Sequence, residues 1–191
     1  PNGIESVVED LGCIDLAIVG EPTNMQMAVA ERGLMVLDCE VSGKSGHVAH
    51  DEGENAIYKA LPIIEWFRNP GFPKVSDWLG EIKTTVSQIS SGNQHNVVPD
   101  SCRFVVDVRT NGLYTNQEVL DYIRAHVQGK VEARSLRLNS SCIPLDHPII
   151  EAAKMCGLIL SGSKTTSDQA VIPWPSVKIG PGDTLRSHTP N

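Results

Sequence analysis

The chain has 191 residues, of which 40% are hydrophobic and 20% are charged, and its formal net charge is −7 at pH 7. This length suits one or two domains of ordinary size. No apolar run approaches the ~20 residues of a membrane-spanning helix, and the negative charge argues against a surface for nucleic-acid phosphates. We therefore expect a globular protein that acts on small molecules.

Five cysteines are scattered along the sequence without a Cys-x-x-Cys spacing. Isolated thiols in odd number are typical of a reduced cytoplasmic protein and not of a disulfide framework or a zinc knuckle. No charged and apolar leader opens the sequence, which begins at Pro1 and ends at Asn191. We expect a cytoplasmic protein, and we interpret the sequence as a fragment of a longer one.

Residues 1–33 have the pattern of an α/β layer. A helix is predicted over Gly3–Asp10, then a buried strand that ends at Glu21, then an extended piece over Met25–Ala30. Open α/β sheets bind ligands at the carboxyl ends of their strands, so Glu21 is the first candidate for chemistry. The alternative is that Gly-Glu-Pro is only a turn that leaves a strand.

The pattern changes between residues 34 and 140, where strand, helix, strand, strand, helix and strand follow one another. The predicted elements are Leu34–Ser42, Glu54–Phe67, Ile82–Ile89, Cys102–Arg109, Thr115–Val127 and Val131–Leu138. This order is the split βαβ arrangement called ferredoxin-like (βαββαβ). Because an α/β pattern precedes and follows it, we predict a ferredoxin-like domain inserted over residues 34–140 of a larger α/β fold.

Two features refine the predicted helices of this insertion. Pro62 falls inside the first amphipathic helix and should kink or loosen it. Thr115 followed by Glu118 is the capping-box pattern at the start of the second helix.

From residue 141 to residue 191 the chain returns to the α/β pattern. Asp146 is predicted to cap a helix over His147–Met155. A polar loop over Ser161–Asp168 and a short strand over Val177–Ile179 follow.

Glu21 and His188 lie on opposite sides of the insertion, each at the end of a strand or loop. Carboxylate and imidazole ligands together suit zinc, manganese or cobalt, but a catalytic zinc needs at least three protein ligands. By spacing alone, an accidental surface pair is the stronger interpretation.

His47 ends the glycine-rich stretch Ser42–His47. The stretch lacks the first glycine of a phosphate-binding loop, so a nucleotide site is disfavoured. A histidine on a glycine-flanked loop is a candidate for a general acid or an oxyanion donor, and the alternative is a solvated histidine. His50, His95, His126 and His147 are interpreted as structural or solvated.

Arg109 ends a predicted strand, and Asn96 begins the connection before that strand. An arginine fork with an asparagine beside it suits a carboxylate ligand, although a surface ion pair and a turn asparagine are equally compatible. Thr166, in the loop Thr165–Asp168, offers a hydroxyl to a substrate or only caps a helix.

These motifs occur in an order that resembles the co-catalytic zinc aminoacylase family, which includes acetylornithine deacetylase, succinyl-diaminopimelate desuccinylase and glutamate-releasing carboxypeptidases. The resemblance covers essentially the whole chain. In chain order the motifs are Gly20-Glu21-Pro22-Thr23, Gly43-Lys44-x-Gly46-His47, Asn55-Ala56-Ile57, Asn96-x-x-Pro99, Asp107-x-Arg109, Thr166-Ser167-Asp168, Gly180-Pro181-Gly182 and His188.

The resemblance implies a catalytic α/β layer that holds two divalent metals, zinc and possibly cobalt, and an inserted lid that forms a homodimer. Glu21 and His188 would each bind one metal. His47 would reach the partner subunit's site and donate to the oxyanion, while Asn96, Arg109 and Thr166 would bind substrate. The implied reaction is hydrolysis of an N-acyl-L-amino acid by metal-activated water, with a glutamate as the base.

The sequence departs from this family in two ways. The other metal ligands and the general base precede Glu21 in the family, and no residues here match them. We therefore expect the isolated chain to be inactive and to bind metal weakly. His50-Asp51-Glu52 stands where the family usually has a proline, so the resemblance does not determine the shape of the loop after His47.

The Gly-Pro-Gly-Asp ending and the short lid most resemble the acetylornithine deacetylase branch, which acts on N-acyl-ornithine or N-acyl-citrulline in arginine biosynthesis. Nothing in the spacing separates acetyl from succinyl. A desuccinylase, a dipeptidase or carboxypeptidase, and a non-catalytic amino-acid-binding or dimerisation module remain the alternatives.

Overall fold

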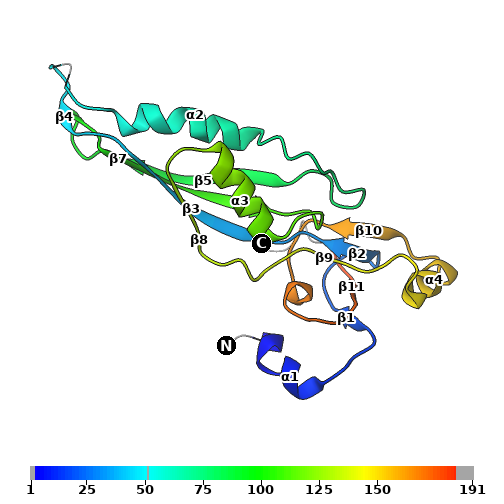
Figure 1. Ribbon diagram of the computed structural model, residues 1–191. Helices are drawn as coiled ribbons and strands as arrows, with labels where there is room; N and C mark the ends of the chain where they lie inside the picture. The colour runs from blue at the N-terminus through cyan, green and yellow to red at the C-terminus, as the bar shows by residue number, and fades with distance from the viewer. Residues whose placement is uncertain (1–2, 51, 184–191) are drawn as a thin grey trace.

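The computed structural model describes residues 3–50 and 52–183, which form an elongated molecule with two main sheets (Figure 1). A four-stranded antiparallel sheet has the order β5-β7-β3-β8. A five-stranded mixed sheet has the order β1-β11-β2-β10, with β9 paired to β2. The α/β class predicted from the sequence is confirmed.

The four-stranded sheet and its two helices follow the predicted order of strands and helices. The first and third strands of the unit are neighbours in the middle of the sheet, and the second and fourth strands form its edges. This is the strand order of a ferredoxin-like fold. The elements are β3 (Met35–Ser42), α2 (Ala56–Arg68), β5 (Lys83–Ser91), β7 (Ser101–Arg109), α3 (Asn116–His126) and β8 (Lys130–Ala133). A two-stranded ribbon, β4 (Gly46–His47) with β6 (Val97–Val98), extends from one end.

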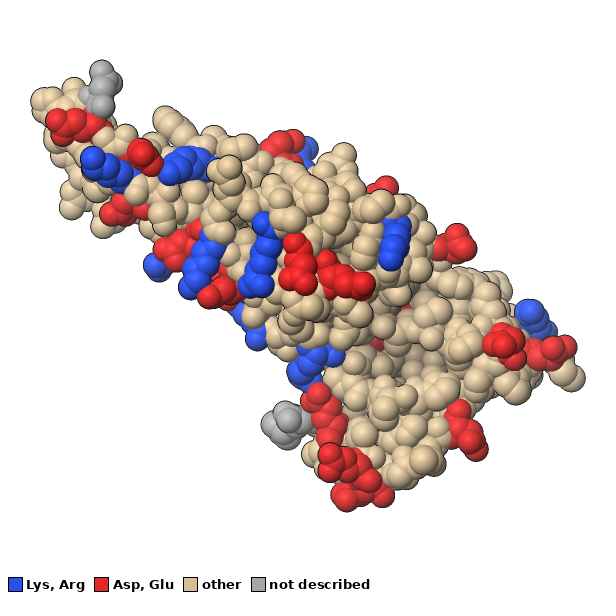
Figure 2. Space-filling view, in the orientation of Figure 1, with Lys and Arg blue, Asp and Glu red and all other residues tan. Residues whose placement is uncertain are grey.

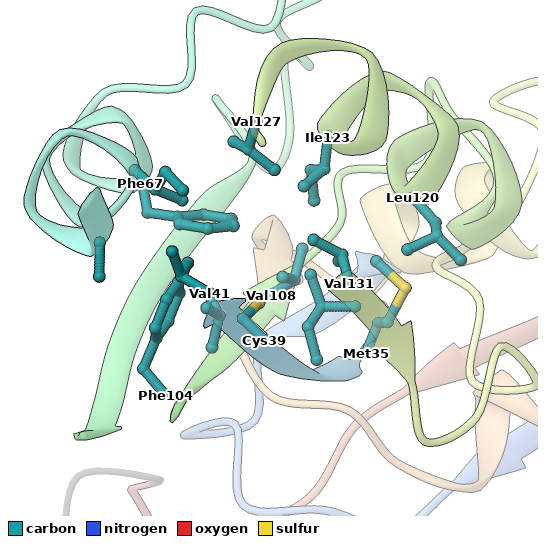
Figure 3. Close-up of a cluster of buried hydrophobic side chains, with 14 of the residues drawn as sticks. Met35, Cys39, Val41, Phe67, Phe104, Val108, Leu120, Ile123, Val127 and Val131 are labelled. Atoms are coloured by element: carbon teal, nitrogen blue, oxygen red, sulfur yellow. The ribbon is translucent and has the colours of Figure 1, made fainter. Parts of the chain in front are cut away.

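The core of this unit lies between the sheet and the two helices (Figure 3). Alternate residues of β3 and β7 are buried because successive side chains of a strand point to opposite faces. Leu37, Val106 and Ile123 are completely inaccessible, and Phe67 packs edge-on against Phe104.

The uncovered face of the same sheet is polar. Arg134 donates a hydrogen bond to Asp38 at 2.8 Å, and Arg103 donates one to Glu40 at 3.0 Å. These hydrogen bonds lower the pKa of both carboxyl groups. On the side of the molecule seen in Figure 2, basic and acidic side chains are also interleaved along the surface. Exposed ion pairs of this kind contribute little to stability, so their main effect is to keep this face of the sheet hydrated.

Three details of this unit differ from the sequence-based expectation. Helix α2 continues through Pro62, which lies on its exposed face, and begins after Asn55, whose side chain accepts from the Ile57 amide at 2.9 Å. Strand β5 contains a register shift between Val86 and Gln88, which breaks its alternation. Strand β8 ends at Ala133, which pairs with Leu37 of β3, and not at Leu138.

The mixed sheet is built around β2, all five residues of which are buried. Helix α4 packs on it, and the core contains Met27, Val29, Ile150 and Val177. The elements are β1 (Ala17–Val19), β2 (Met27–Glu31), β9 (Ser141–Cys142), α4 (Pro148–Met155), β10 (Leu160–Ser163), a 3-10 turn (Asp168–Ala170) and β11 (Ser176–Lys178).

Three predictions for this layer differ from the structure. The residue that caps α4 is His147 and not Asp146: the Nδ1 atom of His147 accepts from the Ile149 amide at 3.3 Å. Strand β10 occupies the first part of the predicted polar loop, because it pairs in parallel with the buried β2. The predicted helix over Gly3–Asp10 is a 3-10 turn (Gly3–Ser6) followed by the short α1 (Val8–Leu11).

The two sheets are joined by packing as well as by the chain. Trp78, in the connection between α2 and β5, packs against the core of the mixed sheet. Gly162 of β10 lies so close to the Trp78 carbonyl that a side chain there would collide with it. Within the described residues, no helix is both long enough and apolar enough to cross a bilayer.

The capping box predicted for α3 is confirmed. The Thr115 hydroxyl accepts from the Glu118 amide at 3.2 Å, and the Glu118 carboxylate accepts from the Thr115 amide at 2.7 Å. We expect Thr115→Ala to lower the free energy of unfolding by about 1 kcal/mol, because the amide loses its acceptor. Thr115→Ser keeps the hydroxyl and should be near neutral. Urea denaturation of both variants checks this, and equal losses would contradict it.

Candidate functional site

Glu21 and Gly180 follow two adjacent parallel strands of the mixed sheet. Strand β1 pairs with β11 in the register Val19 to Lys178, so the residues after both strands leave the sheet at the same edge. The Thr23 amide donates to the Gly180 carbonyl at 3.1 Å, and the Gly180 amide donates to the Thr23 hydroxyl at 3.1 Å. The carboxyl ends of adjacent parallel strands are where open α/β sheets bind ligands.

Gly180 is required at this edge because backbones approach closely. A Cβ atom on Gly180 would lie 2.5 Å from the Glu21 carbonyl oxygen, a distance that no real side chain tolerates. The half-buried Glu21 is thus held against the segment Gly180–Gly182.

His188 lies outside the described residues, so the predicted pairing of Glu21 with His188 stays a prediction. Among residues 3–50 and 52–183, no group of three or more His, Cys, Asp or Glu side chains could hold a metal ion. The described residues therefore do not by themselves fit a metal centre.

His47 lies at the far end of the four-stranded sheet, on the ribbon of β4 and β6. It is exposed, its Nδ1 atom accepts from the Ala49 amide at 3.2 Å, and its ring is 5.3 Å from that of His50. The next amide, that of Val48, donates to the Asn96 carbonyl at 3.2 Å. The structure thus brings the predicted site residues His47 and Asn96 together.

The glycines before His47 serve backbone packing and do not form a phosphate-binding loop. A side chain on Gly43 would collide with the Glu54 carbonyl, and one on Gly46 would collide with the Glu52 carbonyl. The stretch leads into β4 and not into a helix, so it lacks the helix start that binds phosphate.

Arg109 lies at the opposite end of β7 from His47 and Asn96. It is eight positions along the strand from Ser101, or about 26 Å at the usual rise. Its guanidinium binds both carboxylate oxygens of Asp107, at 2.7 and 3.0 Å. The structure therefore does not bring Asn96 and Arg109 together within one chain.

Thr166 is linked to Arg109 through Arg32. The Thr166 hydroxyl donates to the Arg32 carbonyl at 2.8 Å, and Arg32 Nη1 donates to the Arg109 carbonyl at 3.2 Å. Since the hydroxyl proton is used inside the protein, a donor from this residue to a substrate would have to be its backbone N–H.

The comparisons with known proteins agree with this architecture. The model of the M20 peptidase dimerisation domain matches residues 29–134. The chain belongs to the M20 family. The family resemblance inferred from the ordered motifs is thereby confirmed.

Curated M20 relatives carry two kinds of name. Acetylornithine deacetylase of Myxococcus xanthus is 35% identical over 116 residues, which are 56% of this chain and 30% of that protein. Succinyl-diaminopimelate desuccinylase of Wolbachia pipientis wMel is 28% identical over 179 residues, which are 83% of this chain and 44% of that protein. The chain spans less than half the length of these relatives.

Several solved structures share the fold. A putative aminohydrolase from methicillin-resistant Staphylococcus aureus has a TM-score of 0.75 at 16% identity, covering 97% of this chain and 56% of that one. A tripeptidase from Staphylococcus aureus has a TM-score of 0.68 at 18% identity, covering 90% of this chain and 50% of that one.

Sequence reasoning missed three buried charged residues of this M20 chain: Glu31, Arg32 and Lys178. Glu31 and Lys178 form an ion pair of 2.8 Å, and the side chains of both have zero exposure. Arg32 donates to the carbonyls of Leu79, Glu81 and Arg109. Burial, and to a smaller extent the positive charge of Arg109, lowers the pKa of Arg32. The available signal was a charge directly after an apolar run, in Met27–Glu31 and in Ser176–Lys178.

The histidines interpreted as structural or solvated have such environments. His126 stacks on Tyr122 with ring centroids 4.1 Å apart, and His147 caps α4. All five cysteines are free, and burial together with Asp38 raises the pKa of Cys39 to about 12.

The close approach at Gly180 can be tested by substitution. We expect Gly180→Ala to lower the free energy of unfolding by about 1–3 kcal/mol, because the new Cβ must displace the backbone at Glu21. Gly20→Ala is the matched control, since nothing lies within 4 Å of a Cβ there. Thermal and urea unfolding of the two variants give the comparison, and a neutral Gly180→Ala would show that this edge is loosely packed.

Proposed function

We propose that this chain is part of an amidohydrolase that removes the acyl group from an N-acyl-L-amino acid. The observation that carries the proposal is the packing of Gly180 on Glu21, which joins the ends of two parallel strands at the edge where ligands bind. Membership of the M20 family, with relatives named as a deacetylase and a desuccinylase, supports the same reaction class.

The proposed substrate is N-acetyl- or N-succinyl-ornithine or -citrulline, in the arginine biosynthesis of the cytoplasm. The name of the Myxococcus xanthus relative supports an acetylated ornithine, and the names of other relatives support a succinylated diamino acid. A non-catalytic amino-acid-binding or dimerisation module is less favoured, because the curated relatives of this M20 chain carry the names of enzymes.

We assign the metals to the complete enzyme. Two divalent ions, zinc or cobalt, would supply polarisation of the acyl carbonyl there, with Glu21 and His188 as one ligand each. Residues outside this chain would have to provide the remaining ligands and the general base.

The substrate site is proposed to be shared between two subunits. His47 and Asn96 lie together at one end of β7, and Arg109 lies with Thr166 at the other end, about 26 Å away. Since no small substrate spans that distance, His47 and Asn96 of one subunit would act on substrate held by Arg109 and Thr166 of the other.

Each side chain has a role that its geometry allows. Arg109 uses two of its five N–H donors on Asp107, which leaves three for a substrate carboxylate. The exposed His47 is free to donate to the developing oxyanion, while the Thr166 segment is linked to Arg109 through Arg32.

Residues 34–140 are proposed as the lid that makes the dimer. Strand β5 is a nine-residue edge of the sheet, without a strand on its outer side among the described residues. Helix α2 packs on β5 and exposes Tyr58 and Leu61, at 71% and 53%, on its outer face. An unpaired edge beside exposed apolar side chains suits a two-fold contact.

The experiment that tests the function uses the complete natural polypeptide that carries this chain, with added zinc or cobalt. Hydrolysis of N-acetyl-L-ornithine, N-acetyl-L-citrulline, N-succinyl-L-ornithine and N-succinyl-L,L-diaminopimelate is measured. We expect turnover of at least one, and a fall in kcat of about 10²–10³-fold for His47→Ala with unchanged metal content, as for loss of one oxyanion donor.

His95→Ala is the matched control, because His95 is an exposed loop histidine next to Asn96 in sequence. It should retain wild-type kcat. Absence of turnover on the whole panel would contradict the proposed reaction, and wild-type kcat in His47→Ala would remove His47 from it.

The dimer is tested on the 191-residue chain by sedimentation velocity. We expect Leu61→Glu to raise the dimer dissociation constant by at least about 10²-fold, because two copies of the side chain lose their apolar contact. Met155→Glu is the control, since Met155 is 84% exposed on α4 of the other sheet. A chain that is monomeric at high concentration would contradict the proposal.

A further inference from the structure

We propose that the buried Glu31–Lys178 ion pair is a positioning device that fixes the Thr166 segment against Arg109 in the substrate site. The inference rests on the proposed function, because it explains how that site obtains its geometry. Neither residue was singled out by any motif.

The pair is unusual because both side chains are completely inaccessible. Glu31 Oε2 and Lys178 Nζ are 2.8 Å apart, and the exposed fraction of each side chain is 0%. Two charges out of water cost several kcal/mol each, and apolar side chains of similar volume usually give equal or greater stability. Stability alone therefore does not explain this pair, and complete burial prevents either group from touching a substrate.

The hydrogen bonds of the pair converge on the residues beside Thr166. Glu31 accepts from the Ser167 hydroxyl at 2.7 Å and from the Ser167 amide at 3.2 Å. Lys178 donates to the Thr165 carbonyl at 3.1 Å and to the Ser163 hydroxyl at 3.0 Å. The residue before Thr166 and the residue after it are thus each held by one member of the pair.

The same cluster is tied to the lid through the residue after Glu31. The Arg32 carbonyl accepts from the Thr166 hydroxyl, and the Arg32 guanidinium donates to the Arg109 carbonyl. The Thr166 segment is therefore fixed relative to Arg109 by one continuous set of bonds. An apolar pair at these positions would fill the space but offer the segment no donors or acceptors.

The test uses the complete natural enzyme and the substrate of the panel that it hydrolyses fastest. We expect Glu31→Gln to raise KM about 10-fold or more with kcat within about threefold, because hydrogen bonds to a charged group are lost from the segment that borders the substrate. Hydrogen exchange of the Ser167 amide should accelerate by a similar factor. Val29→Ala, a buried change in the same strand, should lower the melting temperature without moving KM.

A double variant separates positioning from stability. Glu31→Gln with Lys178→Met removes both charges, so it should fold even if Glu31→Gln does not. The proposal predicts that the double variant regains melting temperature but keeps the raised KM. Wild-type KM in the double variant, or an unchanged exchange rate at Ser167, would overturn it.

Arg109→Ala distinguishes this inference from the proposed function. If Arg109→Ala raises KM and Glu31→Gln does not, the positioning role is wrong while the substrate site stands. If Arg109→Ala leaves KM unchanged, the assigned substrate site is wrong, and the positioning role is overturned with it.

Discussion

Two successive residues of opposite charge at the end of β2 determine how the two sheets are arranged. Glu31 directs its carboxylate into the mixed sheet, where Lys178 neutralises it. Arg32 directs its guanidinium to backbone carbonyls of the other sheet's connections. A buried charge needs a partner of opposite charge or a hydrogen bond. If the chain left β2 in another direction, Glu31 or Arg32 would lose its partners. That requirement, together with the packing of Trp78 against Gly162, holds the ferredoxin-like unit on the mixed sheet.

Much of the fold could be predicted from local pattern. The capping box at Thr115 and the alternation of β3 and β7 are signals that depend only on near neighbours in sequence. Strand β10 was missed because its polar sequence forms a strand only through pairing with the buried β2, a tertiary effect. His147 displaced Asp146 as the cap because an imidazole nitrogen can accept from an amide as a carboxylate does.

The site was predictable in its parts and not in its arrangement. Motif order identified His47, Asn96, Arg109 and Thr166, but sequence separation gave no measure of which of them meet. Asn96 and Arg109 are 13 positions apart and lie at opposite ends of a strand. Thr166 and Arg32 are far apart in sequence and share a hydrogen bond. The buried Glu31 and Lys178 were missed because a charged side chain next to an apolar run is usually at a surface.

The places where the chain enters and leaves the ferredoxin-like unit touch each other. The Leu34 amide donates to the Leu138 carbonyl at 2.9 Å, and Gly33 packs against the Ser140 backbone. The segment between them therefore leaves and rejoins the mixed sheet at one place, beside the packing of Trp78 across the junction, and a linker of a few residues could join residues 33 and 140 in its absence. Such an attachment lets a protein lineage gain, lose or replace the whole unit while the strands of the mixed sheet keep their register.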